Sequence, residues 1–244
     1  MNHRKIIYGL VACVMSTLFT IGCSKEEVED GLFSVGPTKQ VRFAPGNLAE
    51  DGRSLVAHQW EYGGLFGWGS GNNPGITSLD MDDYLIFNDW GTHVERGWRT
   101  LSIEEWDYVI ARREKATLRR AAGKVNGVNG LILLPDIWAL PEGCTFSAGL
   151  GGWEGNCYTL AQWQQMESAG AVFLPAAGDR WRTEVYNVGN HGFYWSSSPC
   201  NGRAYDLFFG GYYFRVYDGG NDRCRGFSVR LVKDKIRLVI KDKR

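Results

Sequence analysis

The sequence predicts an α+β fold in which helices flank a small antiparallel sheet and long irregular loops connect the elements. Two capping boxes, which begin at Ser102 and Thr159, predict the starts of two helices. From Gly192 onward, short alternating segments are separated by glycine-rich turns, which is the pattern of an antiparallel sheet. The 32 glycines and 10 tryptophans favour many turns and large aromatic anchors, and they argue against a helical bundle.

The first 22 residues have the layout of a lipoprotein signal peptide. A short basic region at residues 3–5 precedes the apolar residues 6–21, a stretch too short to be taken first for a membrane span. The stretch ends in Thr20-Ile21-Gly22-Cys23, where Thr20 replaces the more usual leucine. We therefore expect residues 1–22 to be removed and Cys23 to be lipidated. An ordinary secretory signal with an incidental cysteine is the alternative.

Residues 23–30 are expected to form an acidic tether behind the lipid. The run Ser24-Lys25-Glu26-Glu27-Val28-Glu29-Asp30 is too charged to pack into a core. It is similar to the acidic signal that sends some Gram-negative lipoproteins to the outer face of the outer membrane, although a bare solvated tether would have the same composition. We expect a lipid-anchored outer-membrane protein exposed at the cell surface, in which residues 31–244 form one domain.

The domain is expected to begin with a strand and a long loop region. Within residues 31–43, Val41 and Phe43 alternate with polar neighbours, which predicts a strand. Residues 45–98 are rich in turn-forming Gly, Asn and Pro, so we expect loops. Loops of this length need side chains that pack them down. The candidates are Trp60, Phe66, Trp68, Trp90 and Trp98.

The two helices are predicted from their N-caps. Ser102 is followed three residues later by Glu105, and Thr159 by Gln162, which gives two capping boxes. Gly170 suits the left-handed position at the end of the second helix. The expected inner faces consist of Trp106, Val109 and Ile110 in the first helix and of Trp163 and Met166 in the second.

Short apolar runs predict the strands of the second half. Residues 130–135 and 171–175 are expected to be buried strands. An antiparallel sheet is expected at the end of the domain, followed by one more alternating segment. The sheet segments are residues 192–197, 203–209, 212–217 and 226–232, and the last segment is 235–241.

The sequence contains few candidates for catalysis or metal binding. A net charge of zero gives no reason to expect a nucleic-acid partner. There is no nucleophile elbow, no His-Glu-x-x-His and no paired Cys-x-x-Cys. His58, His93 and His191 are expected to be surface or hydrogen-bonded residues. Asp80-Met81-Asp82-Asp83 can attract calcium but lacks the EF-hand spacing, so we expect a solvated loop and no cofactor.

Four further cysteines follow Cys23, in a compartment that permits disulfides. Cys144 and Cys157 can pair across a loop, but spacing alone does not fix the geometry that a disulfide needs. The pairing of these two residues, and of Cys200 and Cys224, therefore stays open.

Five motifs follow one another along residues 31–232. They are Gly97-Trp98-Arg99-Thr100-Leu101-Ser102-x-x-Glu105-Trp106, Val125-Asn126-Gly127-Val128-Asn129-Gly130-Leu131-Ile132-Leu133-Leu134-Pro135, Gly170-Ala171-Val172-Phe173-Leu174-Pro175-Ala176-Ala177-Gly178, Tyr194-Trp195-Ser196-Ser197-Ser198 and Gly226-Phe227-Ser228-Val229-Arg230-Leu231-Val232. In this order and spacing, the chain resembles a family of surface lipoproteins of Gram-negative gut bacteria. That family is similar to the C-type lectin fold, in the branch that includes formylglycine-generating-enzyme-like domains.

The resemblance implies a C-type lectin-like domain over residues 31–244, with two helices beside a small twisted antiparallel sheet whose exposed positions bind a ligand. The Glu-Pro-Asn or Gln-Pro-Asp tripeptide of calcium-dependent lectins is absent, which argues against sugar recognition through calcium. The histidine-rich iron motif of the sulfoxide-synthase relatives is absent too. Cys200 and Cys224 can stand for the reactive cysteine pair of a formylglycine-generating enzyme, but their surroundings do not match that enzyme's pattern.

The end of the domain has an unusual composition. Residues 196–232 contain no Lys, Glu, Gln, Trp or Met, although these types make up 37 of the first 195 residues and about seven would be expected. The types present instead, Cys, Asn, Gly, Arg, Tyr, Asp, Phe and Ser, are reached from the asparagine codon AAC by changing adenines alone. This bias suits a target protein of a diversity-generating retroelement. A strand-rich sheet that avoids Lys and Glu is the alternative.

Under the retroelement hypothesis, framework positions stay fixed and exposed positions vary. The framework would be Ala204, Leu207, Phe209, Val216, Gly226 and Val229. The variable, ligand-binding positions would be Cys200, Asn201, Arg203, Asp206, Phe208, Gly210, Tyr213, Arg215, Tyr217, Asp218, Cys224 and Arg225.

We therefore expect a non-catalytic surface receptor or adhesin. It would bind a protein or glycan through residues about 200–225 and contact the membrane only through its lipid anchor. One alternative is an oxidase of the formylglycine-generating type that uses Cys200 and Cys224. A structural or fimbria-associated lipoprotein is the other.

Overall fold

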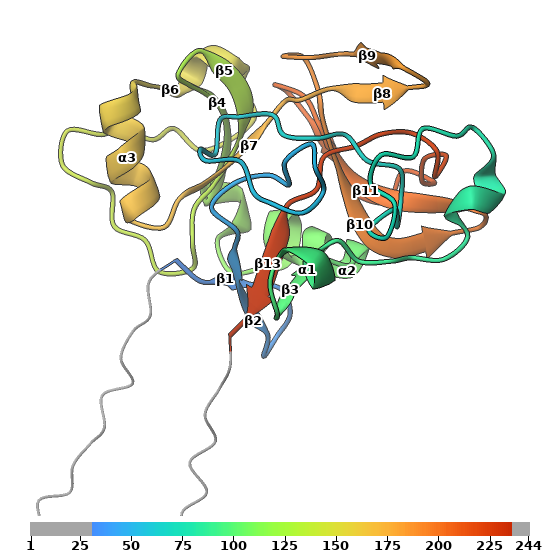
Figure 1. Cartoon of the computed structure of the whole chain (residues 1–244). Coiled ribbons are helices and arrows are strands. Elements are labelled where there is room, and N and C mark those ends of the chain that lie inside the picture. The colour runs from blue at the N-terminus through green and yellow to red at the C-terminus, as the bar shows by residue number, and fades with distance from the viewer. Residues whose placement is uncertain (1–30, 236–244) are drawn as a thin grey trace, which may run out of the picture.

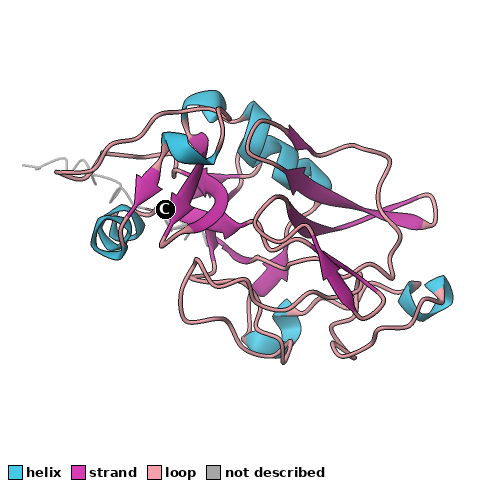
Figure 2. Cartoon of the chain, turned by 90° about the horizontal axis from the view of Figure 1, so that it is seen from above, coloured by secondary structure: helices cyan, strands magenta, loops and turns pink. Residues whose placement is uncertain are grey.

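The computed structural model describes residues 31–235 and has a mixed α+β architecture (Figure 1). The predicted leader, the tether with Cys23 and most of the predicted segment 235–241 lie outside the described residues. Small sheets make up most of the centre of the molecule, and the helices lie at the periphery (Figure 2). Within residues 31–235, no helix has both the length and the apolar character needed to cross a membrane.

The first sheet brings the two described ends of the chain together. Its strand order is β1-β2-β13-β3, and β13 pairs antiparallel with both β2 and β3. The fully buried Val232 lies opposite Phe43 on one side and Arg99 on the other. Residues 31–43, predicted as one entry strand, form two short strands that pair antiparallel with each other. The four strands are β1 (Phe33–Ser34), β2 (Gln40–Phe43), β3 (Trp98–Thr100) and β13 (Leu231–Asp234).

The second sheet contains two predicted strands, β5 (Val128–Leu133) and β7 (Val172–Pro175). Between β4 (Arg120–Val125) and β5, Asn126 and Gly127 have φ angles of 50° and 79°. Both central residues of a type I′ hairpin turn need positive φ, and Asn-Gly supplies it at low cost. The sheet has the order β6-β4-β5-β7, with β6 at Cys157–Tyr158.

The third sheet contains the predicted strands of the C-terminal region. β10 (Gly192–Cys200) pairs antiparallel with β11 (Arg203–Phe209), and β11 pairs with the short strand β12 (Phe214–Arg215). The prediction that residues 226–232 continue this sheet is wrong. Ser228 forms an isolated parallel bridge with Tyr194 of β10, Phe227 and Gly226 form bridges with Phe66 and Arg180, and the chain then ends in β13 of the first sheet.

An additional hairpin, which the sequence pattern did not reveal, precedes β10. It consists of β8 (Asp179–Trp181) and β9 (Glu184–Tyr186), and Arg182 in its turn has a φ of 60°. All three residues of β9 are exposed. A strand of this kind buries no apolar face, so periodicity cannot identify it.

Both capping boxes are formed as predicted. The Ser102 hydroxyl accepts from the Glu105 amide at the start of α2 (Ile103–Asp107), and the Thr159 hydroxyl accepts from the Gln162 amide at α3 (Leu160–Ser168). Gly170 then ends α3 with a φ of 94°. The remaining helical segments are short. They are α1 (Gly91–Val94), the 3₁₀ turns η1 (Met81–Tyr84), η3 (Ala116–Leu118) and η4 (Trp153–Gly155), and the π-helical turn η2 (Tyr108–Arg112) that extends α2.

Large aromatic side chains fix the long loop region, as predicted. Phe66, Trp68 and Trp90 are buried in one hydrophobic cluster together with Trp195 and Phe227. The Trp68 indole donates to the Ser196 carbonyl at 2.8 Å, and the Trp195 indole to the Phe66 carbonyl at 2.6 Å. The loops are therefore held against β10 by directional bonds as well as by apolar contact.

Candidate ligand-binding face

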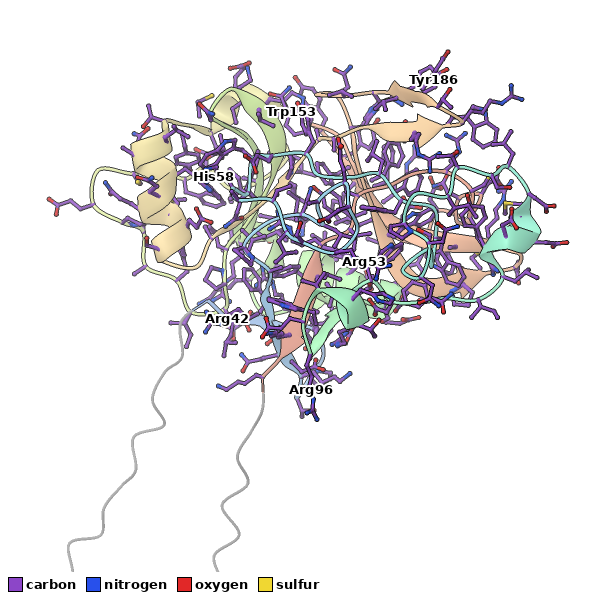
Figure 3. The ribbon with its side chains drawn as sticks, viewed as in Figure 1. Arg42, Arg53, His58, Arg96, Trp153 and Tyr186 are labelled. Carbon is purple, nitrogen blue, oxygen red and sulfur yellow. The ribbon has the colours of Figure 1, made fainter. Side chains whose placement is uncertain are left out.

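Exposed aromatic side chains gather at the end of the molecule that lies opposite the described chain ends. Figure 3 shows Trp153 and Tyr186 at this end, whereas Arg42 and Arg96 lie near the end from which the chain leaves the domain. Tyr212 is 73% exposed and Tyr213 is 41% exposed. We call the surface formed by Trp153, His191, Phe208, Tyr212, Tyr213 and Arg215 the aromatic end face.

A stack of three phenylalanine rings supports this face from below. Phe227 is fully buried, and its ring centroid lies 4.8 Å from that of Phe193. The Phe193 ring stacks in turn on Phe208 at 4.6 Å, because the two residues are cross-strand partners in β10 and β11. Phe208 is only half-buried, so the stack connects the core with the surface. A ring held in this way has lost its rotamer freedom before any ligand arrives.

Polar and cationic groups lie over the half-buried Phe208 ring. Arg215 pairs with Phe208 across β11 and β12, and its guanidinium lies 5.7 Å from the Phe208 centroid and 5.8 Å from that of Tyr213. The His191 Nε2 atom lies 3.1 Å from the Tyr213 hydroxyl oxygen. Asp218 forms an exposed ion pair with Arg215, with an N–O distance of 2.6 Å. The pair is solvated, so it orients the guanidinium more than it stabilises the fold.

Two glycines position Tyr212 beside Trp153. The Gly152 amide donates to the Gly211 carbonyl at 2.9 Å, which joins η4 to the loop before β12. A Cβ atom on Gly211 would lie 3.1 Å from the Trp153 ring, and one on Gly152 would lie 2.9 Å from the Tyr212 hydroxyl oxygen. The absence of side chains at these positions therefore lets the loop lie close to Trp153.

The arrangement offers a ligand rigid aromatic surface, hydroxyl groups and one cation. Tyrosine and arginine on a fixed scaffold are the residue types that dominate interface hot spots and paratopes. Exposed aromatic rings also provide flat surfaces for stacking. The face is thus suited to binding a macromolecular surface.

The structure brings some of the predicted binding residues together and separates others. Phe208, Tyr213 and Arg215 form one cluster, and Asp218 pairs with Arg215. Tyr217 is exposed elsewhere, with its ring 5.7 Å from Tyr205. Asn201 and Arg203 are also exposed and lie at the turn between β10 and β11, where Arg203 forms an ion pair with Asp222 at 3.1 Å.

Four predicted binding positions are buried, which corrects the expectation that all of them are exposed. They are Cys200, Asp206, Gly210 and Cys224. Asp206 is 6% exposed and accepts from the Asn221 amide at 2.8 Å. Burial raises the pKa of this carboxyl to about 7, with a further contribution from Asp218, while the Asn221 bond and Arg225 oppose the rise.

Arg225 is half-buried and ties the loop before Gly226 to β8. Its guanidinium forms an ion pair with the buried Asp179 at 2.8 Å and lies 4.9 Å from the Trp181 ring centroid. Asn187 donates to the other Asp179 oxygen. Arg225 thus contributes to the structure of the domain, which its sequence context did not reveal.

The four described cysteines are free thiols, so the proposed pair Cys144–Cys157 is not formed. Cys200 lies 3.4 Å from the Gly219 carbonyl oxygen, and burial raises the pKa of the Cys224 thiol. Burial of this kind favours the unreactive thiol over the nucleophilic thiolate.

The remaining candidates for metal binding or catalysis are held by local contacts. His58 is exposed and stacks on Trp60, and His93 Nε2 lies 3.0 Å from the Asn72 side-chain oxygen, so the predicted surface or hydrogen-bonded roles are confirmed. Asp80 caps η1 by accepting from the Asp82 amide. Within residues 31–235, no three His, Cys, Asp or Glu side chains are grouped so that they could hold a metal ion.

Sequence patterns did not identify Trp153, His191 and Tyr212 as members of the face. Trp153 and Tyr212 each follow a Gly-Gly pair, and the approach of η4 to the loop before β12 explains the second glycine of each pair, Gly152 and Gly211. His191 immediately precedes β10. Its position beside Tyr213 therefore depends on the pairing of β10 with β11, which places Phe193 opposite Phe208. A comparison of the chain with protein-family models, curated proteins and solved structures found no match.

Proposed function

We propose that this protein is a non-catalytic, lipid-anchored receptor or adhesin of the outer membrane, which binds a protein or glycan outside the cell through its aromatic end face. The observation that carries the proposal is the cluster of the exposed Tyr213 and Arg215 around the half-buried Phe208, which rests on a fixed aromatic stack. Aromatic rings exposed together on one face lower the solubility of a protein unless a partner covers them. No membrane contact is required beyond the lipid.

Within this proposal, the domain is C-type lectin-like. Support comes from α2 and α3, which lie beside small sheets in a single chain with long intervening loops. The chain would leave the membrane at Cys23 and enter the domain at β1. Because both described chain ends lie opposite Trp153 and Tyr186, an anchor at Cys23 would leave the aromatic end face free to meet a partner (Figure 3).

Display at the cell surface can be tested by protease treatment of intact cells that express the full chain. We expect the folded domain to be released or degraded, while a periplasmic control protein stays intact. Retention of the whole domain on treated cells, with degradation only after permeabilisation, would contradict outward display.

Diversification by a retroelement is part of the proposal. The six proposed framework residues are buried, and the proposed variable positions Tyr213, Arg215, Tyr217 and Asp218 are exposed. The neighbouring DNA provides the test. We expect a reverse-transcriptase gene and a near-copy of the 3′ coding end that differs only at adenines. Without these, the protein is a binding protein of fixed sequence.

The ligand can be sought by screening the purified protein on arrays of glycans and of cell-surface proteins. A ligand supports the proposal if the wild-type protein binds it and a Tyr213→Ser/Arg215→Ser variant does not.

The oxidase alternative requires both Cys200 and Cys224. Retention of ligand binding by a Cys200→Ser/Cys224→Ser variant is expected, and loss of binding by its correctly folded form would contradict the binding proposal.

A further inference from the structure

A cleft of about 420 Å³ lies between the loops at residues 62–66 and 74–77 and the segment from Ala177 to Val188. No residue of the aromatic end face lines it. Small-molecule sites in proteins have volumes of roughly 300–1,000 Å³, so the cleft can hold a small molecule or the end of a chain.

The walls of the cleft are mainly apolar. The apolar side chains that line it are Leu65, Phe66, Pro74, Ile76, Val185 and Val188. Phe66 is 2% exposed and pairs with Phe227 through two backbone hydrogen bonds, of 2.9 and 3.0 Å. The ring therefore belongs to a fixed wall, and an apolar group placed against it would lose contact with water.

Arg180 is the charged group built into this cleft. It lies in β8, is 9% exposed, and uses Nε and Nη1 to donate to the carbonyls of Leu65 and Arg182 at 3.3 and 2.7 Å. Within residues 31–235, Arg180 has no carboxylate partner, and its Nη2 atom donates to no acceptor. Nη2 is nevertheless accessible to solvent, so a ligand can reach it. By contrast, the buried Arg113 pairs with Asp136 at 3.1 Å.

The chain around Arg180 fixes the position of its guanidinium. The backbone groups of Arg180 and Gly226 exchange two hydrogen bonds, of 2.8 and 2.9 Å. A Cβ atom on residue 226 would lie 2.6 Å from Arg180 Nε, so glycine is needed for the side chain to lie across this strand. Glu50, which is exposed, is the only other charged residue among the described residues that line the cleft.

We propose that the cleft binds a carboxylate joined to an apolar body. The carboxylate accepts from Arg180 Nη2, and the apolar body lies between Phe66 and the side chains of Ile76 and Val188. A charge-assisted bond of this type satisfies a buried guanidinium that lacks an acidic partner. Two sources have this chemistry, a free small acid and the C-terminal residue of a peptide.

The test is calorimetric titration of the purified full-length protein with N-acetyl-leucine and with N-acetyl-leucinamide. We expect the acid to bind at least about tenfold more tightly than the amide, which lacks the charge. A free-acid tripeptide, Ala-Ala-Leu, distinguishes the sources. Tighter binding of the tripeptide than of N-acetyl-leucine identifies a peptide C-terminus, and equal or weaker binding identifies a small acid. Equal affinity for N-acetyl-leucine and its amide, or no binding at about 10 mM, would overturn the proposal.

Two variants connect any binding with this cleft. Arg180→Gln removes the cation and should abolish the preference for the acid over the amide. Val185→Asp places a carboxylate on the exposed strand β9 at the cleft, without disturbing the core, and should weaken acid binding about tenfold. The matched control is Leu118→Asp, at an exposed apolar residue that does not line the cleft. Unchanged acid binding by Val185→Asp would overturn the proposal even if Arg180→Gln fails to fold.

Discussion

At the scale of single residues, Arg230 joins three segments of the core. It is 1% exposed and donates to the Asn47 side-chain oxygen and to the carbonyls of Ala44 and Phe173, at 2.9, 2.9 and 2.6 Å. A buried guanidinium is costly unless its donors are satisfied, and here the acceptors come from the first loop and from β7. In the sequence Arg230 looks like a surface residue between two apolar neighbours, so its burial could not be predicted.

Replacement of Arg230 by methionine should lower the free energy of unfolding by at least about 3 kcal/mol. The variant leaves three buried acceptors without a donor, and each such group costs roughly 1–3 kcal/mol. Urea denaturation measures the change. Arg215→Met is the matched control, since Arg215 is exposed, and it should stay within about 0.5 kcal/mol of the wild type. A loss below about 1 kcal/mol in Arg230→Met would show that the acceptors find other partners.

Asp206 makes the stability depend on pH. Burial raises the pKa of its carboxyl to about 7 in the folded protein, above the unfolded value of about 4. The folded state therefore binds more protons than the unfolded state between about pH 4 and pH 7, and stability falls as the pH rises through this window. The contribution is fully present below pH 4 and is lost above pH 7.

An Asp206→Asn variant should remove this dependence. At pH 8 we expect it to be more stable than the wild type, by a difference on the order of 4 kcal/mol, because the amide carries no charge to bury. At pH 4 the two proteins should be about equally stable. Thermal or urea unfolding across this range measures the difference. A wild-type advantage at pH 8 would mean that Asp206 is held charged by Arg225.

At the scale of elements, the helix starts were predictable because capping boxes are local signals. The two helices differ in what the Glu or Gln side chain of the capping box contacts. Glu105 is 7% exposed and accepts from Arg99 at 2.6 and 2.8 Å as well as from the Ser102 amide. The cap of α2 is therefore part of an ion-pair network with β3, whereas Thr159 is exposed and Gln162 is half-buried.

Glu105→Ala should destabilise the protein by at least about 3 kcal/mol, and Thr159→Ala by about 1 kcal/mol. The first change breaks a largely buried ion pair together with a cap, and the second removes a cap alone. Chemical denaturation of both variants provides the comparison. Glu104→Ala, at the exposed neighbouring position, should change stability by no more than about 0.5 kcal/mol. Similar losses for Glu104→Ala and Glu105→Ala would contradict this account of α2.

The strands were predictable where an apolar run or alternation marks them, as in β5, β7, β10 and β11. The exposed strand β9 carries no such mark, and β4 mixes Arg120 and Lys124 with small residues. The sheet that residues 226–232 join could not be derived from the sequence. An apolar pattern does not say which sheet a strand joins: Ser228 forms a bridge with Tyr194 of β10, whereas Leu231–Asp234 pairs with β2 and β3.

At the scale of the whole molecule, β13 closes the domain by lying between β2 and β3. The described chain ends lie at one end of the molecule, and Trp153 of the aromatic end face lies at the other (Figure 3). Part of the face, Phe208, Tyr213 and Arg215, followed from composition and alternation. Trp153, His191 and Tyr212 did not, because three segments far apart in the sequence meet only in the folded chain.

The most direct test of the proposed function is the dissociation constant of the ligand found by screening, compared between face and control variants. For Tyr213→Ser/Arg215→Ser we expect binding at least about 100-fold weaker, since central aromatic and arginine residues contribute about 2 kcal/mol or more each. The control Leu85→Ser/Leu118→Ser removes two exposed apolar residues outside the face and should change affinity less than about twofold. Equal affinities of the wild type and the face variant would contradict binding through the aromatic end face.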